Sequence, residues 1–273
     1  MDHYCAPPHV LRYYPRAVKS EVFLQAFLRF VQQEFKLSEC RVATMLSICS
    51  DDLNSDSLPQ KDLIGPFFLG GLDGYPFVGK TGIGAFSHHI PQPGVALIFF
   101  GPHIGITQYN NKGKKSKSSE KGIVGQVQRQ GQAAPSACCG AAQLALQHLE
   151  KRKIIPKKIH EYDLQDFQQE TLEQIALQHE GEILSAGPPG SGERLLSLTE
   201  VIYRSIRTQM LNLLTKVEFH QPAFAFGGVL INEDGGQKSD IEFRDAYYLH
   251  SGEIETVTTR FNQNAEARFR AVP

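Results

Sequence analysis

Apolar residues recur every three or four positions in several long stretches of the chain, which is the spacing of amphipathic helices. In residues 17–36 the valines and phenylalanines fall largely on one face. Residues 137–153, 163–180 and 193–216 also have helical patterns, and the first of these ends in basic residues, which the helix dipole favours there. The pattern therefore predicts four helices.

Between the helices lie continuous apolar runs that are short enough to be strands. Residues 42–49, 95–100 and 223–231 are of this kind, and such runs are typical of parallel strands that are buried on both faces. Residues 241–249 are expected to form a pairing strand after a turn at 232–236. We therefore predict an α/β fold with a mainly parallel central sheet flanked by helices.

The rest of the chain adds no second domain to this pattern. Residues 104–109 and 123–129 are expected to be short extended stretches. A Gly-Pro-Pro-Gly segment at 187–190 is a candidate boundary, but the residues beyond it hold few strands of their own. One domain is therefore expected, with residues 1–16 as a lead-in and 266–273 as a loosely held tail.

Composition narrows the class of partner. The chain carries 28 lysines and arginines against 29 aspartates and glutamates, so no strong overall field directs it to nucleic acid or to an anionic membrane. No apolar run approaches the roughly 18 residues of a membrane-spanning helix. The expected partner is a small molecule or another protein, with no nucleic acid and no membrane.

The cysteines and the first residues bear on the compartment. Five cysteines, two of them adjacent, make a poor disulfide framework and suit a reducing compartment. The first residues have neither the basic region nor the apolar core of a secretory signal. A cytoplasmic location is expected for the chain as given. A chain from which a transit peptide had been removed would look the same, so the chloroplast stroma stays an alternative.

Cys49 stands where the apolar run 42–49 stops and two carboxylates, Asp51 and Asp52, begin. In open α/β sheets the ligand crevice lies beyond the carboxyl ends of the strands, so position alone makes Cys49 and Asp51 site candidates. The alternative is a core cysteine before a polar loop, because cysteine is among the most buried residue types. Soft metal ligands at the ends of other strands would favour a functional site at Cys49 over a core cysteine.

Two such ligands follow later in the chain. His103 comes just after the strand at 95–100, and Cys139 stands at the first turn of a helix, where a thiolate is favoured. Two thiolates and an imidazole suit zinc, and three protein ligands leave a fourth position for water, which is a catalytic pattern. A hydrogen-bonded histidine, and a redox pair or plain packing for Cys138 and Cys139, stay as alternatives.

Residues 74–81 fit the Walker A pattern of nucleotide-binding proteins literally. That loop must feed directly into a helix whose N-terminus faces the phosphate. Here Gly82 and Gly84 follow and Pro91 comes soon after, which is a poor start for a helix. A close-packed loop is therefore expected, and a nucleotide-binding protein is kept only as a minor hypothesis.

Four segments stand in a specific order along the chain. They are Cys49-Ser-Asp51, Gly79-Lys-Thr-Gly-Ile-Gly-Ala-Phe-Ser-His-His-Ile-Pro91, Gly101-Pro-His103-Ile-Gly105 and Cys139-Gly-Ala141. Together they resemble the limiting-CO2-inducible protein B/C family, which includes the theta-class carbonic anhydrases. The resemblance runs from about residue 17 to residue 248.

The resemblance implies a fold similar to the beta-class carbonic anhydrases, a homodimer, and a Zn2+ ion bound by Cys, His and Cys. Carried onto this chain, these ligands fall on Cys49, His103 and Cys139, with Asp51 as the carboxylate of a dyad. Cys138 competes with Cys139, and Cys139 is preferred because Cys-Gly at a helix start resembles the beta-class ligand.

The chain departs from the beta class at two points. That class has an arginine two residues after the aspartate, where this chain has Leu53. The histidine and second cysteine also lie close together there, whereas a long insertion separates them here. The dyad arginine must therefore come from elsewhere, and Arg129 is the first candidate, with Arg41 the second.

Reversible hydration of carbon dioxide to bicarbonate is the activity that the resemblance implies. His88 and His89 are candidates to carry the proton to solvent, because imidazole titrates near neutrality, and packing in an aromatic loop is their alternative role. A second hypothesis is a catalytically inert scaffold or binding protein linked to carbon dioxide, with the same fold. The intact ligand set and Asp51 favour the enzyme.

Overall fold

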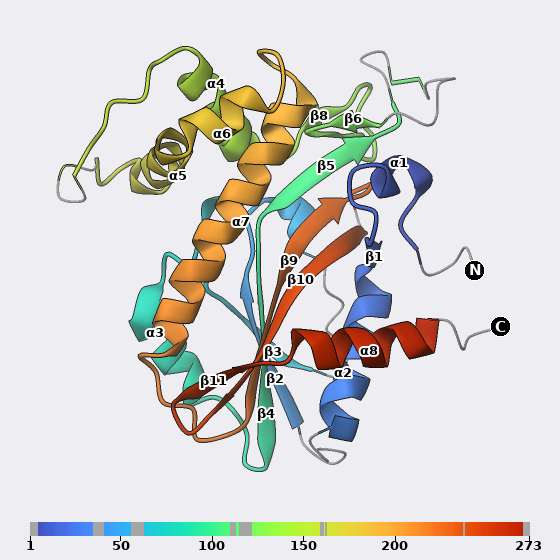
Figure 1. Ribbon diagram of the computed structural model, residues 1–273, viewed down its shortest axis with the longest axis vertical. Helices are drawn as coiled ribbons and strands as arrows, with labels where there is room; N and C mark the ends of the chain where they lie inside the picture. Colours follow the sequence, from blue (N-terminus) through green and yellow to red (C-terminus); the bar gives the residue numbers. More distant parts are fainter. Residues whose placement is uncertain are drawn as a thin grey trace.

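A central sheet runs through the molecule, and helices cover both of its faces (Figure 1). The computed structural model describes residues 5–34, 41–55, 63–109, 113–114, 122–158, 161, 163–236 and 238–269. The strands are β1 (Val18–Lys19), β2 (Arg41–Ser47), β3 (Ile64–Phe68), β4 (Gly94–Phe100), β5 (His103–Thr107), β6 (Ile123–Val124), β7 (Gln126–Val127), β8 (Ser136–Ala137), β9 (Ala223–Asn232), β10 (Ser239–His250) and β11 (Glu253–Thr256). The α-helices are α1 (Pro8–Leu11), α2 (Ser20–Glu34), α3 (Gly79–Ser87), α4 (Gly140–Glu150), α5 (Phe167–Gln178), α6 (Glu180–Ser185), α7 (Gly192–Leu214) and α8 (Thr258–Phe269).

The order of strands across the sheet is β1-β10-β9-β4-β2-β3. The four strands from β9 to β3 pair in parallel, while β10 runs antiparallel to β9. The first half of β9 pairs with β4 and its second half pairs in parallel with β5, in the same register on both sides of Gly101 and Pro102. The predicted α/β fold with a mainly parallel sheet is confirmed.

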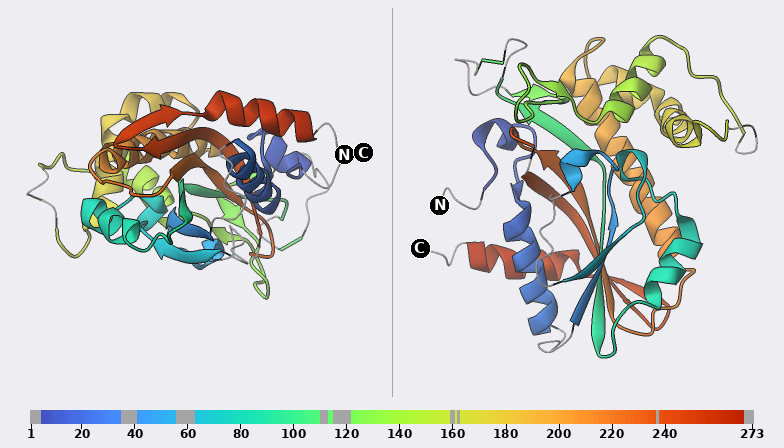
Figure 2. Two further views of the ribbon diagram at one scale, coloured as in Figure 1. Left: turned by 90° about the horizontal axis from the view of Figure 1, so that it is seen from below. Right: turned by 180° about the vertical axis from the view of Figure 1, so that it is seen from behind.

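Alternate side chains of the buried strands pack into two separate hydrophobic cores, one on each face of the sheet. In β4, Ile98 and Phe100 belong to a core that α3 to α7 cover, whereas Leu97 and Phe99 belong to a core beneath α2 and α8. The views in Figure 2 show these two helical layers on opposite sides of the sheet. Burial on both faces explains why the strands read as continuous apolar runs.

The predicted helices are present, with shifts at their ends. The stretch 17–36 becomes α2 only from Ser20 onward, because Val18 and Lys19 pair with β10 as a short strand. The other three predicted helices become α4, α5 and α7. The tail, expected to be loose from residue 266, is helical through Phe269 in α8, and residues 270–273 lie outside the described part.

Two elements of the Gly- and Pro-rich stretch were not predicted. β3 is a strand at the edge of the sheet, where Pro66 is tolerated because one side of an edge strand needs no donor. The expectation of a loop after residue 79 was wrong, since Gly79–Ser87 forms α3. Ile83 and Phe86 of α3 are buried in the core, and this burial outweighs the low helix propensity of its glycines.

The stretch 123–129 is broken in two rather than continuous. Gly125, with φ of 84°, separates β6 from β7, and its N–H donates to the carbonyl of Gly105. β6 therefore pairs with β5 while β7 pairs with β8.

Among the described residues, no helix is both long enough and apolar enough to cross a membrane.

Candidate metal centre

Cys49, His103 and Cys139 converge at the carboxyl edge of the sheet. Cys49 lies just beyond the end of β2, His103 is the first residue of β5, and Cys139 is the N-cap of α4. The two sulfurs are 4.0 Å apart, and both lie within 4.8 Å of a ring nitrogen of His103. All three side chains are buried. The topology thus brings together three soft ligands that are far apart in sequence.

Hydrogen bonds fix the ring of His103. Its Nδ1 lies 2.7 Å from Oδ1 of Asn232, and its main-chain N–H donates to Oδ1 of Asp73 at 3.1 Å. Its Nε2 is buried without a hydrogen-bond partner among the described residues. A buried ring nitrogen without a partner, next to two thiols, is the donor set that a zinc ion requires, so the residues present fit such an ion.

The protein environment alone favours the neutral thiols. The hydrogen bond with Cys139 and burial raise the pKa of the Cys49 thiol. For Cys139, the bond from Cys49 works in the opposite direction, but burial and the nearby Asp73 carboxyl raise its pKa overall. A bound dication reverses this balance, because a coordinating thiol is deprotonated outright. Metal binding here should therefore release protons.

Cys138 faces a different side of the histidine ring. Its sulfur lies 3.3 Å from Oδ1 of Asn232 and 3.6 Å from Nδ1 of His103. Nδ1 is the nitrogen that Asn232 already engages. The structure therefore groups Cys139, and not Cys138, with the two other candidate ligands.

Arg129 reaches two carboxylates next to Cys49. Its Nη2 donates to Oδ1 of Asp51 at 3.1 Å, and its Nη1 donates to Oδ1 of Asp52 at 2.5 Å. The Asp51 side chain is 17% exposed and that of Asp52 is 81% exposed. The guanidinium lowers the pKa of the Asp52 carboxyl. Arg129 is therefore shared between the candidate dyad residue and a surface carboxylate.

The β9–β10 turn holds Arg129 in this place. Asp234 accepts hydrogen bonds from the main-chain N–H groups of Gln128 and Gln108, and the N–H of Gly235 donates to the carbonyl of Gln128. The second candidate, Arg41, is exposed at the first position of β2, at the opposite end of the strand from Cys49. Of the two arginines, only Arg129 reaches Asp51.

His88 and His89 are exposed at the C-terminal end of α3. From there the chain turns into Gly94, the first residue of β4, which pairs with the first residue of β2. The crossover helix thus delivers both histidines to the amino edge of the sheet, whereas the ligand cluster is at the carboxyl edge. The structure does not bring them to the cluster, and the ring of His89 instead lies 6.3 Å from that of Phe67.

The Walker-like segment does not form a phosphate cradle, although a helix follows it. The N–H groups of Gly74, Tyr75, Phe77, Val78 and Gly79 all donate to carbonyls within residues 69–76. A phosphate loop needs those groups free to surround an anion. Residues 74–78 instead form a closed loop that follows Asp73, and α3 begins at Gly79.

Asp73 and Asn232 are site residues that the sequence analysis missed. Asp73 is fully buried, its main-chain N–H donates to Sγ of Cys49 at 3.2 Å, and its Oδ2 has no partner among the described residues. Burial raises the pKa of Asp73 to about 6. Asn232 ends β9, so its position at a strand end was the available signal for it, whereas Asp73 lies in a short helical turn, Leu72–Gly74, and had no such signal.

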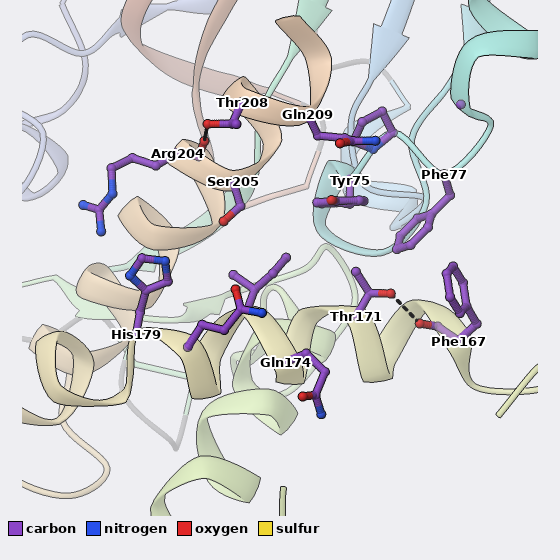
Figure 3. Close-up of a pocket in the computed structure, with 14 residues that line it drawn as sticks. Tyr75, Phe77, Phe167, Thr171, Gln174, His179, Arg204, Ser205, Thr208 and Gln209 are labelled. Carbon is purple, nitrogen blue, oxygen red and sulfur yellow. Dashed lines mark hydrogen bonds between the residues drawn. The ribbon is translucent and has the colours of Figure 1, made fainter. Parts of the chain in front are cut away.

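Two cavities are lined by residues other than the three candidate ligands. One, of about 680 Å3, is bounded by α5, α7 and residues 75–79, and Figure 3 shows Phe77 and Phe167 next to each other at one end of it. Another, of about 560 Å3, is lined by Arg129 and the β9–β10 turn. The second therefore opens next to the arginine that holds Asp51.

Comparison with known proteins supports the predicted resemblance. A family model described as "Limiting CO2-inducible proteins B/C beta carbonic anhydrases" matches residues 19–251. No curated protein sequence matches the chain.

Two solved structures share the fold. PtLCIB4, a homolog of the limiting CO2-inducible protein LCIB, superposes with a TM-score of 0.69 at 23% identity, over 91% of this chain and 98% of that one. LCIB superposes with a TM-score of 0.59 at 19% identity, over 91% of this chain and 97% of that one. At these identities the two structures support the fold and nothing finer.

Proposed function

We propose that this chain, which belongs to the family of limiting CO2-inducible proteins B/C and beta carbonic anhydrases, is a zinc-dependent carbonic anhydrase that interconverts carbon dioxide and bicarbonate. The family supports a carbonic-anhydrase-like protein with this substrate pair.

The observation that carries the proposal is the convergence of Cys49, His103 and Cys139. Three ligands of this kind match catalytic zinc sites, in which a fourth position is left for water or substrate. When bound, zinc supplies Lewis acidity that makes water a nucleophile at neutral pH. The three side chains would hold the ion, and their burial would limit the access of bulk solvent to it.

Asp51 is the proposed proton acceptor of the reaction. It lies two residues after Cys49, and Arg129 and the N–H of Leu53 both donate to its Oδ1. Two donors to one carboxylate oxygen fix the orientation of the group. In the proposed reaction this carboxylate would accept a hydrogen bond from the water that attacks carbon dioxide.

Two measurements test the proposal: the rate of carbon dioxide hydration by stopped flow, and the zinc content of the same protein. Hydration and stoichiometric zinc are expected for the parent protein, and both should be lost in Cys139→Ser. Cys5→Ser is the matched control, because Cys5 is exposed and outside the cluster. Absence of hydration in a zinc-loaded parent would contradict the catalytic part of the proposal.

A second candidate is an inert scaffold or carbon-dioxide-binding protein with the same site. Its supporting observation is that Arg129 is shared with Asp52, while Leu53 occupies the position of the beta-class arginine. Zinc that binds without hydration would favour this candidate. The homodimer that the family resemblance implies is proposed for either function. Size-exclusion chromatography with light scattering measures the molar mass and so the number of subunits.

A further inference from the structure

We propose that Asn232 is a positioning residue that fixes His103 as an Nε2 ligand and ties it to the loop that carries Asp51. This inference rests on the metal site of the proposed function. Asn232 is the last residue of β9 and is 1% exposed. Its amide contacts both segments at once.

The orientation of the amide follows from its partners. Nδ2 of Asn232 lies 3.3 Å from the carbonyl oxygen of Leu53, and a carbonyl oxygen can only accept. The NH2 group must therefore face Leu53, and the amide oxygen faces His103. This assignment does not depend on distinguishing nitrogen from oxygen in the side chain itself.

That orientation determines the tautomer of the histidine. Oδ1 of Asn232, 2.7 Å from Nδ1 of His103, can only accept a hydrogen bond. Nδ1 must therefore carry a proton, which leaves Nε2, the nitrogen without a partner, as the ring nitrogen that can bind a metal. Outer partners of this kind set the tautomer and the ring orientation of metal-binding histidines.

The same amide reaches the loop beyond Cys49. Nδ2 of Asn232 also lies 3.2 Å from Oδ1 of Asn54, and Nδ2 of Asn54 donates to the carbonyl of Cys49 at 3.4 Å. The short helical turn Asp52–Asn54, capped by Asp51, is thereby attached to the end of β9. One buried side chain thus couples the imidazole ligand, the first thiol ligand and the dyad loop.

Cys138 completes this arrangement. Its sulfur, 3.3 Å from Oδ1 of Asn232, is placed to be a second donor to the same oxygen. The oxygen therefore has two donors, and the NH2 group has two acceptors. A network in which every member is satisfied holds one geometry, whereas a partly satisfied network does not.

The test measures the histidine tautomer and zinc affinity in the parent, Asn232→Leu and Asn232→Asp. Nitrogen-15 NMR of the zinc-loaded protein reports which imidazole nitrogen keeps its proton, and His103→Gln identifies the resonances of His103. Competition with a chromophoric chelator gives the affinity for zinc. Thr199→Val is the control, because it removes another buried hydrogen bond, from Thr199 to Leu195 within α7.

Asn232→Leu should lose the single Nδ1–H tautomer and bind zinc about 10- to 100-fold more weakly. Asn232→Asp keeps the accepting oxygen, so the tautomer and most of the affinity should be retained, and Thr199→Val should change neither. A folded Asn232→Leu protein with the parental tautomer and affinity would overturn the proposal. If that variant does not fold, loss of the tautomer in folded Asn232→Asp overturns it.

Neither readout uses carbon dioxide. A parent that binds zinc but does not hydrate carbon dioxide would count against the proposed catalysis alone. Unchanged affinity and tautomer in Asn232→Leu would count against the role of Asn232 alone.

Discussion

Arg129 and Asp51 are 78 positions apart in the chain, yet Nη2 of the arginine lies 3.1 Å from Oδ1 of the aspartate. The same oxygen accepts from the N–H of Leu53, the residue that stands where the beta class has its arginine. The ion pair is therefore supplied by a distant segment, which the β9–β10 turn holds in place. A proton-accepting role for Asp51 depends on that docking.

Asp51→Asn should lower the rate of carbon dioxide hydration by about 100-fold or more while zinc remains bound, because the amide cannot accept a proton. Stopped-flow rates and metal content measure the two effects separately. Unchanged hydration in a zinc-loaded variant would remove Asp51 from the mechanism.

Asp52→Asn distinguishes the two carboxylates that share Arg129. Asp52 is 81% exposed, so its ion pair is screened by solvent and should contribute little. The hydration rate should stay within about threefold of the parent, whereas Arg129→Gln should reduce it about 10-fold or more, since Asp51 then loses a charged donor. Equal losses in both variants would mean that the three residues act as one unit.

Cys138→Ser and Cys139→Ser should differ in zinc content. The serine hydroxyl at position 138 can still donate to Asn232, so zinc should be retained. The variant at position 139 should lose it, because that sulfur belongs to the ligand group. Elemental analysis after dialysis measures the zinc content of both variants. Loss of zinc in Cys138→Ser and its retention in Cys139→Ser would instead make Cys138 the second thiolate ligand.

Chelation of the metal should lower the melting temperature. An ion present at 1,000 times its dissociation constant stabilises the folded state by about 4 kcal/mol, which for a protein of this size corresponds to roughly 10 °C. Thermal melts with and without EDTA measure this shift. Cys49→Ser should melt at the lower temperature in both conditions; a response to EDTA equal to that of the parent would argue against Cys49 as a ligand.

Asp240 should make stability depend on pH. Burial raises its pKa from 3.8 to about 7, although Nζ of Lys19 lies 3.0 Å away. Well below pH 4 the carboxyl is neutral in both the folded and the unfolded chain. As the pH rises toward 7, the unfolded chain ionises first, so folding loses stability through this group.

Asp240→Asn removes that loss. The free energy of unfolding of the variant, relative to the parent, should increase between about pH 4 and pH 7 and then level off, by up to roughly 4 kcal/mol. Urea unfolding across this range measures it. Glu253→Gln, at an exposed position, is the control and should show no such trend; a flat difference for Asp240→Asn would contradict the assigned burial effect.

Local patterns determined much of the fold. The apolar runs that became β2, β4 and β9 could be predicted as strands, because burial on both faces requires continuous apolar sequence. The helical periodicity of the stretches that became α2 and α7 likewise predicted these helices from local sequence. The helix α3 was missed because its stability comes from burial of Ile83 and Phe86, which outweighs the local propensity of its glycines.

The sequence by itself determined which ligand types stand at strand ends, and the resemblance selected Cys49, His103 and Cys139 from among them. Only the tertiary structure decided that these side chains share one cluster and that His88 and His89 lie at the other edge of the sheet. Strand direction and crossover geometry set those positions, and they are properties of long-range pairing. The contacts of Asn232 belong to the same class, because no local pattern encodes a hydrogen bond between residues 129 positions apart.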